Sequence, residues 1–255
     1  MNTAEVIQLL RQTCAGYKFE PLAIYKAGGT HAWPLVAKNE ADLADQLAGG
    51  DHFLPLPREP AALANIVEVA VVDFLLDQLG NTVTLTRGRE RVYPDLELEV
   101  GGKIYAVDVK VARRKVNAKG QPTGKTDSRI TLYTGNTFFL YPQIKWPGIL
   151  RPFADYAAHI DLVGLYTLDV GSAARVRDFE LLVVEAWKIG SRSRSSTTRE
   201  YLGAIDDIAK LRNEDGEFGS ADEFYRYWRA HDWKIGKAVK KQLQKLLDLA
   251  AKSQS

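Results

Sequence analysis

Three short strand-like runs between residues 82 and 111 constrain the fold more than any other feature of the sequence. The runs are TVTLT, YPDLELEV and KIYAVDVKV, and they are separated by Gly88 and by Gly101-Gly102. Alternating apolar and polar residues bounded by glycine favour β-strands. Because the Gly101-Gly102 connection is tight, we expect the second and third runs to pair as antiparallel neighbours.

Helical and further strand-like segments surround these runs. Helical spacing of apolar residues predicts helices over residues 3–13, 40–49, 61–79, 200–213, 221–231 and 236–251. The segments 22–36, RITLYT, DLVGLYTLDV and LLVVEAWKI read as strands, the first as a hairpin around Gly28-Gly29. The polar, basic segment 112–128 predicts a loop. This order predicts an α+β fold, with a central mixed β-sheet flanked by helices.

Composition excludes several classes of protein. Hydrophobic residues make up 45% of the chain and charged residues 26%, which excludes wholesale disorder. No apolar run approaches the roughly 18 residues of a membrane span, and the N-terminus reads as an amphipathic helix instead of a secretion signal. The single cysteine, Cys14, excludes an internal disulfide and fits a reducing compartment. We therefore expect a cytoplasmic protein without a membrane partner.

Charge is strongly segregated although the net charge is only +2. Residues 39–79 hold eight acids and one base, whereas residues 101–129 hold eight bases and two acids. Residues 187–203 add four bases against one acid. Such segregation can create a basic cleft that grips a phosphate backbone. The alternative is that solvated loops simply collect lysine and arginine.

Two carboxylates and a lysine are the candidate chemical centre. Asp95 begins the second run, and Asp108-Val109-Lys110 closes the third. Alternation along a strand places Asp108 and Lys110 on one face and turns Val109 into the core. Antiparallel pairing would add Asp95, and oxygen ligands of this kind suit Mg²⁺. The alternative is three unrelated surface charges, because a bare PD…DxK pattern is weak.

In this context the chain resembles the PD-(D/E)xK nucleases, specifically the EcoRV-type type II restriction endonucleases. The similarity runs in order through YPDLELEVGGKIYAVDVK, RPFADYAAHIDLVGLYTL, KIGSRSRSSTTREYLGAI and SADEFYRYWR. It implies that Asp95 and Asp108 bind Mg²⁺, that Val109 lends a backbone carbonyl to the metal, and that Lys110 is the catalytic lysine. It also implies a bacterial, cytoplasmic homodimer that acts on double-stranded DNA, with a cognate DNA methyltransferase as companion.

A further acid on the preceding helix belongs to the family pattern. Glu68 in NIVEVAVV fits this position as a catalytic residue and metal ligand, although its spacing to Asp95 is a few residues short. Its alternative is an exposed helix glutamate. Glu97 and Glu99 alternate with Asp95 and compete for a second metal position, but strand glutamates usually face solvent.

The segment Gly190–Gly203 resembles the loop that enters the major groove in this family. Thr197, Thr198 and Gly203 match the pattern, while Arg194, Ser195 and Ser196 replace a glycine and an asparagine. A flexible Ser/Arg linker is the alternative. The residues expected to contact DNA are Arg113, Lys115, Lys119, Arg192, Arg194, Ser195, Ser196, Thr197, Thr198 and Arg199. His52, His159 and His231 show no ligand spacing and are expected to be structural.

These observations divide the chain into four parts. They are a dimerisation part (1–36), a catalytic core (37–190), a DNA-recognition loop (190–203) and a helical part that supports DNA binding (204–255). The leading hypothesis is a type II restriction endonuclease that uses Mg²⁺ to hydrolyse both strands at a short palindrome and leaves 5′-phosphate ends. The alternatives are a structure-selective junction or repair nuclease of the same fold and a non-catalytic DNA-binding protein.

Overall fold

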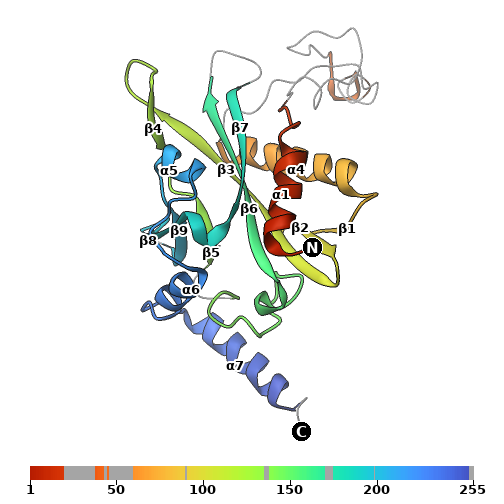
Figure 1. The fold of residues 1–255 in the computed structure, drawn as a ribbon, viewed down its shortest axis with the longest axis vertical. Helices are drawn as coiled ribbons and strands as arrows, with labels where there is room; N and C mark the ends of the chain where they lie inside the picture. Colours follow the sequence, from red (N-terminus) through yellow and green to blue (C-terminus); the bar gives the residue numbers. More distant parts are fainter. Residues whose placement is uncertain are drawn as a thin grey trace.

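The computed structural model describes residues 1–19, 38–42, 45, 60–89, 91–134, 138–169, 175–197 and 199–252. Figure 1 shows the arrangement of its elements. The strands are β1 (Thr84–Arg87), β2 (Leu96–Val100), β3 (Lys103–Val116), β4 (Pro122–Thr126), β5 (Thr131–Thr134), β6 (Ala158–Leu168), β7 (Val176–Glu185), β8 (Gly190–Arg194) and β9 (Tyr201–Ala204). The helices are α1 (Thr3–Cys14), α4 (Pro60–Leu79), α5 (Ile208–Arg212), α6 (Ala221–Arg229) and α7 (Lys237–Lys252), with 3₁₀ turns at Phe153–Asp155 and Ala186–Ile189.

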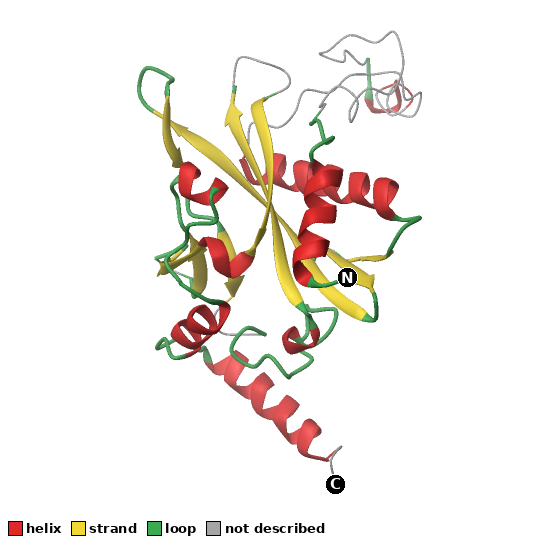
Figure 2. Cartoon of the chain, viewed as in Figure 1, coloured by secondary structure: helices red, strands yellow, loops and turns green. Residues whose placement is uncertain are grey.

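A mixed sheet organises the described part of the chain (Figure 2). Its strand order is β1-β2-β3-β6-β7, and β4 pairs with β3 beyond this row. The β3–β6 pair is parallel, and the other pairs are antiparallel. A smaller sheet has the order β5-β9-β8. The predicted α+β fold with a central mixed sheet flanked by helices is confirmed.

Helices α1 and α4 cover one face of the central sheet. Val6 and Leu10 of α1 pack with Val67 and Val71 of α4 against Val107 of β3, and all five are fully buried. Asn2 begins α1 with a capping box, in which its side chain accepts from the Glu5 N–H while the Glu5 carboxylate accepts from the Asn2 N–H. The amphipathic pattern of residues 3–13 is therefore used to build this core.

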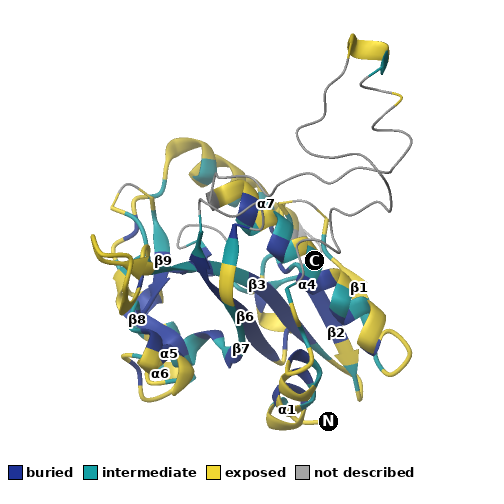
Figure 3. Cartoon of the chain, turned by 90° about the horizontal axis from the view of Figure 1, so that it is seen from above, coloured by how far each residue is buried: buried dark blue, intermediate teal, exposed yellow. Residues whose placement is uncertain are grey.

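The small sheet and helices α5 and α6 cover the opposite face. Val163 and Leu165 of β6 pack in one core with Tyr133, Phe224 and Trp228, all within 2% of complete burial. In Figure 3 the buried strands β3 and β6 run between these two covered sides. Polar side chains on β3 therefore lie in the interior of the fold unless they reach the edge of the sheet.

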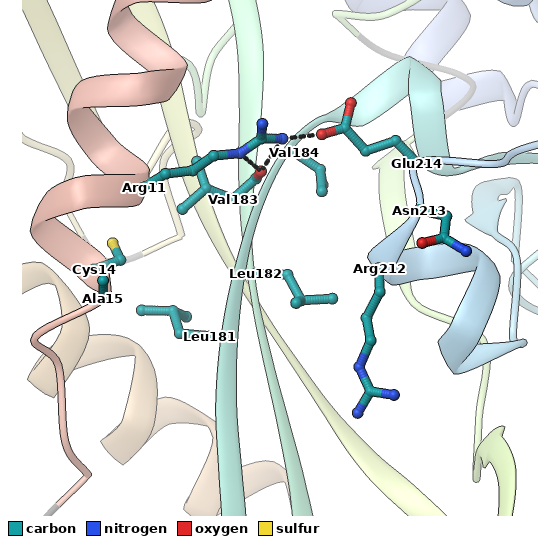
Figure 4. Close-up of a pocket in the computed structure, with 10 residues that line it drawn as sticks. All are labelled: Arg11, Cys14, Ala15, Leu181, Leu182, Val183, Val184, Arg212, Asn213 and Glu214. Carbon is teal, nitrogen blue, oxygen red and sulfur yellow. Dashed lines mark hydrogen bonds and ion pairs between the residues drawn. The ribbon is translucent and has the colours of Figure 1, made fainter.

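Arg11 links α1 to the C-terminal part of the chain (Figure 4). Its guanidinium donates to the Val183 carbonyl at 3.0 Å and forms an ion pair with Glu214. Lys188 also holds Glu214, at 2.6 Å. A cavity of about 360 Å³ lies between α1, β7 and the residues after α5, with Cys14 in its wall. Helix α1 is thus part of the folded body.

Two sequence predictions about β3 were wrong. The Asp108-Val109-Lys110 segment lies in the middle of β3, because β6 pairs with β3 from Tyr105 to Arg113. The predicted loop 112–128 is instead a two-stranded ribbon formed by the end of β3 and by β4. Residues 115–125 of this ribbon are all exposed, so their sequence lacks the apolar alternation that predicts a strand. Backbone pairing between β3 and β4 forms the ribbon instead.

The prediction of a helix over residues 200–213 was also wrong. Residues 201–204 form β9, which pairs with β5 and β8, and only Ile208–Arg212 is helical. The predicted recognition loop 190–203 is accordingly a β8–β9 hairpin. Non-local strand pairing overrode the local helical pattern here. Among the described residues, no helix is long and apolar enough to cross a membrane.

Some predictions lie outside the described residues. These are the hairpin at 22–36, most of the helix at 40–49, His52 and Thr198. The boundaries of the four predicted parts of the chain stay predictions. The helices predicted at 3–13, 61–79, 221–231 and 236–251 are confirmed as α1, α4, α6 and α7.

Candidate active site

The turn at Gly101-Gly102 brings Asp95 beside Asp108. Both glycines have positive φ angles, 60° and 70°, which permit the tight β2–β3 connection. Leu96 of β2 pairs with Val107 of β3, so Asp95, one residue before β2, faces Asp108. The Asp95 N–H donates to Asp108 Oδ1 at 3.3 Å, and the Val109 N–H donates to Asp95 Oδ2 at 2.7 Å. The expected meeting of the two carboxylates is observed.

Lys110 completes the group. Its ammonium forms an ion pair with Asp108, as expected for two side chains on one face of a strand. Val109 points to the opposite face and is 6% exposed within the α1–α4 core. The Lys110 side chain is 19% exposed and that of Asp108 8%, so the pair lies largely out of water. Solvent screens such a pair much less than a surface pair.

Glu68 reaches this group from α4. It forms a hydrogen bond with Asp95, and it is half-buried and not the exposed helix glutamate of the alternative interpretation. Burial and then the nearby charge of Asp108 raise the pKa of Glu68. The sequence placed Glu68 only by its resemblance, because the distance between a helix and a strand that packs on it cannot be read from spacing.

The carboxyl groups of this site, on Glu68, Asp95 and Asp108, outnumber its ammonium group, on Lys110. Burial, Asp108 and Glu68 together raise the pKa of Asp95 to about 8. Like charges in a low-dielectric site repel unless protons or a cation neutralise them. Glu68, Asp95 and Asp108 offer oxygen donors, which are the ligands that Mg²⁺ prefers. The donor set therefore fits a divalent cation of this kind.

These side chains do not, however, form a complete set of metal ligands as they lie. No cluster of three or more His, Cys, Asp and Glu side chains within the described residues has a geometry that could hold a metal ion. The Lys110–Asp108 ion pair supplies one physical reason, because the ammonium occupies a carboxylate that a metal ion would need.

Glu97 does not compete for this position. It is 4% exposed, and its carboxylate accepts from Arg151 at 2.7 and 2.8 Å and from Tyr156 at 2.6 Å. Burial alone would raise the pKa of Glu97, but these hydrogen bonds lower it. Glu99 is exposed at the β1–β2 edge, opposite Thr84 and Ile104. The two competitors thus have other surroundings, although they alternate with Asp95.

Asp161 is a buried carboxyl group beside the site that the sequence analysis missed. It lies on β6 directly opposite Asp108 in the parallel register and is 1% exposed. Burial raises the pKa of Asp161 to about 8, although the charge of Lys110 acts in the opposite direction. A lone carboxylate at the start of the apolar run DLVGLYTL was the only available signal.

His159 is buried among aromatic side chains. Its ring stacks on Phe153 with centroids 3.7 Å apart, and its Nδ1 is 2.7 Å from the Tyr93 hydroxyl. Burial lowers the pKa of His159 to about 3, so the ring stays neutral. His231 packs against Trp233 with centroids 4.5 Å apart. These contacts support the structural interpretation of both histidines.

The β3–β4 ribbon carries the basic residues that follow the site. Lys115 and Lys119 are exposed on it, near the tip of the ribbon. Arg113, closer to the site, forms an ion pair with Asp127. Lys125 lies 3.4 Å from Asp206. The charges of Lys115 and Lys119 are thus presented to solvent beyond the edge of the sheet.

The β8–β9 hairpin is ordered by its own contacts. The Ser195 hydroxyl lies 2.8 Å from that of Thr131, and Ser196 accepts from the Arg199 N–H at 3.1 Å. The Arg199 guanidinium lies 5.7 Å from the centre of the Tyr201 ring, and Thr197 is exposed. Residues 190–194 and 201–204 are therefore paired strands and not a linker without secondary structure.

Two arginines of this hairpin already hold carboxylates. Arg192 pairs with Glu223 at 2.6 Å and lies over the Phe218 ring at 4.7 Å. Arg194 pairs with Glu200 at 2.7 Å and is 31% exposed. These pairs fix the direction of each guanidinium but leave other N–H groups of each fork for a further partner.

Comparison with known proteins adds one match. The family model described as "Restriction endonuclease EcoRV" matches residues 31–251, which include every site residue discussed above. No curated protein sequence matches the chain.

Proposed function

Because this chain belongs to the EcoRV restriction endonuclease family, we propose that it is a Mg²⁺-dependent type II restriction endonuclease. The family makes it a nuclease, and the proposal adds that it hydrolyses both strands of a short palindromic site and leaves 5′-phosphate ends. The observation that supports this best is the meeting of Asp95, Asp108 and Lys110 in one half-buried group, with Glu68 beside them.

Each of these residues has a definite role in the proposal. Asp95, Asp108, Glu68 and the Val109 carbonyl would hold Mg²⁺, which when bound lowers the pKa of a bound water and stabilises charge on the phosphate. The Val109 N–H keeps Asp95 in place by its 2.7 Å hydrogen bond. Lys110 supplies a positive charge beside the reacting phosphate, in a site where burial strengthens such a charge.

The remaining surfaces would hold the DNA. Exposed Lys115 and Lys119 suit phosphate contacts, since the β3–β4 ribbon extends past the site. The β8–β9 hairpin offers Arg192, Arg194 and short hydroxyl side chains, which suit base edges in the major groove. We also propose a homodimer, because two-fold protein symmetry matches a palindromic site, and a cognate methyltransferase that protects the same site.

Digestion of a sequenced phage DNA in Mg²⁺, followed by run-off sequencing of the ends, tests the proposal. Discrete fragments with one shared end sequence are expected, and Asp95→Ala should give none while still binding DNA in Ca²⁺. Cleavage of branched substrates alone would instead indicate a junction or repair nuclease. Binding without any cleavage would indicate a non-catalytic DNA-binding protein.

A further inference from the structure

Asp161 is a buried carboxylate for which the proposed function has no role. It lies opposite Asp108 in the parallel β3–β6 register. Side chains at opposite positions of parallel strands point to the same face of the sheet, with the strands about 4.8 Å apart. Within the described residues, Asp161 Oδ2 is buried and has no hydrogen-bond partner. Buried acceptors without a partner are rare and require a physical reason.

Lys110 lies two residues along β3 from Asp108, on the face of the sheet that also carries Asp161, and its ammonium group forms an ion pair with Asp108. Attraction to Lys110 and repulsion from Asp108 are the two charge effects on the Asp161 carboxyl. The ammonium is therefore close to two carboxylates on one face of the sheet, although it is ion-paired with Asp108.

Asp108 cannot fully serve both as the partner of Lys110 and as a metal ligand. A divalent cation bound to Asp108 neutralises that carboxylate and repels the ammonium group that now occupies it. A buried ammonium group without a counter-ion is costly. Lys110 therefore needs a second partner, placed so that the side chain can shift without leaving the site.

We infer that Asp161 is a positioning residue for Lys110. When Asp108 binds the metal, the Asp161 carboxyl group accepts the ammonium group of Lys110. This inference rests on the proposed function, because it assumes that Asp108 is a metal ligand. Asp161 acts through Lys110 and touches neither the metal nor the DNA. Its unpartnered Oδ2 is the acceptor left open for this shift.

Amine labelling of Lys110 in metal-free protein, read by peptide mass spectrometry, tests the inference without catalysis. Asp108→Asn removes the charge of Asp108, as a bound metal would neutralise it. In that variant Asp161 should still protect Lys110, so labelling rises only slightly. Asp108→Asn combined with Asp161→Asn should raise the labelling rate several-fold above the sum of the two single effects.

Thr167→Val is the matched control. Thr167 also lies on β6, is 3% exposed, and has a buried hydroxyl without a hydrogen-bond partner among the described residues. It lies several residues beyond the position opposite Lys110. Thr167→Val should leave the labelling of Lys110 unchanged, both in the wild-type protein and in Asp108→Asn. Asp161→Glu, which keeps the charge, should retain part of the protection that Asp161→Asn loses.

Single-turnover cleavage provides the second arm. Residues that orient a metal site indirectly typically contribute 10- to 100-fold, so Asp161→Asn should slow cleavage by about that factor without changing DNA affinity. In a Lys110→Met background, the same substitution should cause no further loss. A purely structural role of Asp161 would instead slow both backgrounds alike and so overturn the inference.

The outcomes separate this inference from the proposed function. Equal labelling of Lys110 in Asp108→Asn and in the Asp108→Asn, Asp161→Asn double variant overturns the inference and leaves the nuclease proposal intact. A wild-type protein that cuts no DNA overturns the nuclease proposal, while the labelling result still decides whether Asp161 holds Lys110.

Discussion

Replacing Asp95 by asparagine should stabilise the metal-free protein while it abolishes cleavage. The site crowds Glu68, Asp95 and Asp108 around one lysine, and the resulting pKa of Asp95 is about 8, against an ordinary value of 3.8. Asparagine keeps the shape of the side chain and an oxygen that can accept from the Val109 N–H. It removes the charge that the folded state disfavours, which is a common exchange of activity for stability at functional sites.

The magnitude and the sign follow from linkage. For an acid whose pKa is raised on folding, the cost is absent below the unfolded value, grows as the pH rises toward the folded value, and is constant above it. At about 1.4 kcal/mol per pH unit, the upper limit for Asp95 near pH 7 is about 4 kcal/mol. Because Glu68 titrates together with Asp95, we expect about 2 kcal/mol of stabilisation.

Urea unfolding in EDTA, at about pH 5 and about pH 7.5, measures this difference. The advantage of Asp95→Asn should be small at the lower pH and larger at the higher pH, and Ca²⁺ should reduce it by stabilising the wild type. Glu97→Gln is a matched control of opposite sign, because Arg151 and Tyr156 stabilise the Glu97 carboxylate. The reasoning is refuted if Asp95→Asn is the less stable protein at both pH values.

Three further predictions concern cleavage and DNA binding. Lys110→Ala should slow single-turnover cleavage by roughly 10²-fold or more and leave metal binding partly intact, measured by Ca²⁺ titration; an unchanged rate would remove Lys110 from the site. Lys115→Ala and Lys119→Ala should each reduce the slope of log K for DNA binding against log salt concentration by about one. Each should weaken binding to all DNA sequences alike, and a loss that depends on the sequence would contradict a phosphate contact. Arg194→Ala should reduce the preference for cognate over scrambled duplexes by about 1–3 kcal/mol, with a G·C pair in the site. Glu200→Gln should also reduce it, because it removes the ion pair that fixes the direction of the Arg194 guanidinium. Equal losses on both duplexes would make Arg194 a phosphate contact.

The local part of the site could be predicted from the amino-acid sequence. Alternation along a strand placed Asp108 and Lys110 on one face, and the short Gly101-Gly102 turn placed Asp95 beside them. Both rules act over a few residues, so the backbone geometry alone enforces them. The helices α1, α4, α6 and α7 were equally readable, because their apolar faces repeat with the helical period.

The residues that surround this local group could not be predicted, because they depend on contacts between distant segments. Asp161 is 53 positions from Asp108 in the chain, and only the parallel β3–β6 pairing makes the two neighbours. Glu97 was weighed as a metal competitor or a solvent-facing glutamate, but it is buried, and Arg151 binds its carboxylate from a distant segment. The same holds for the β3–β4 ribbon and for β9, whose polar or helix-like sequences became strands through pairing with distant partners. Contacts of this kind depend on which strands meet, and no periodicity within one strand encodes its partner.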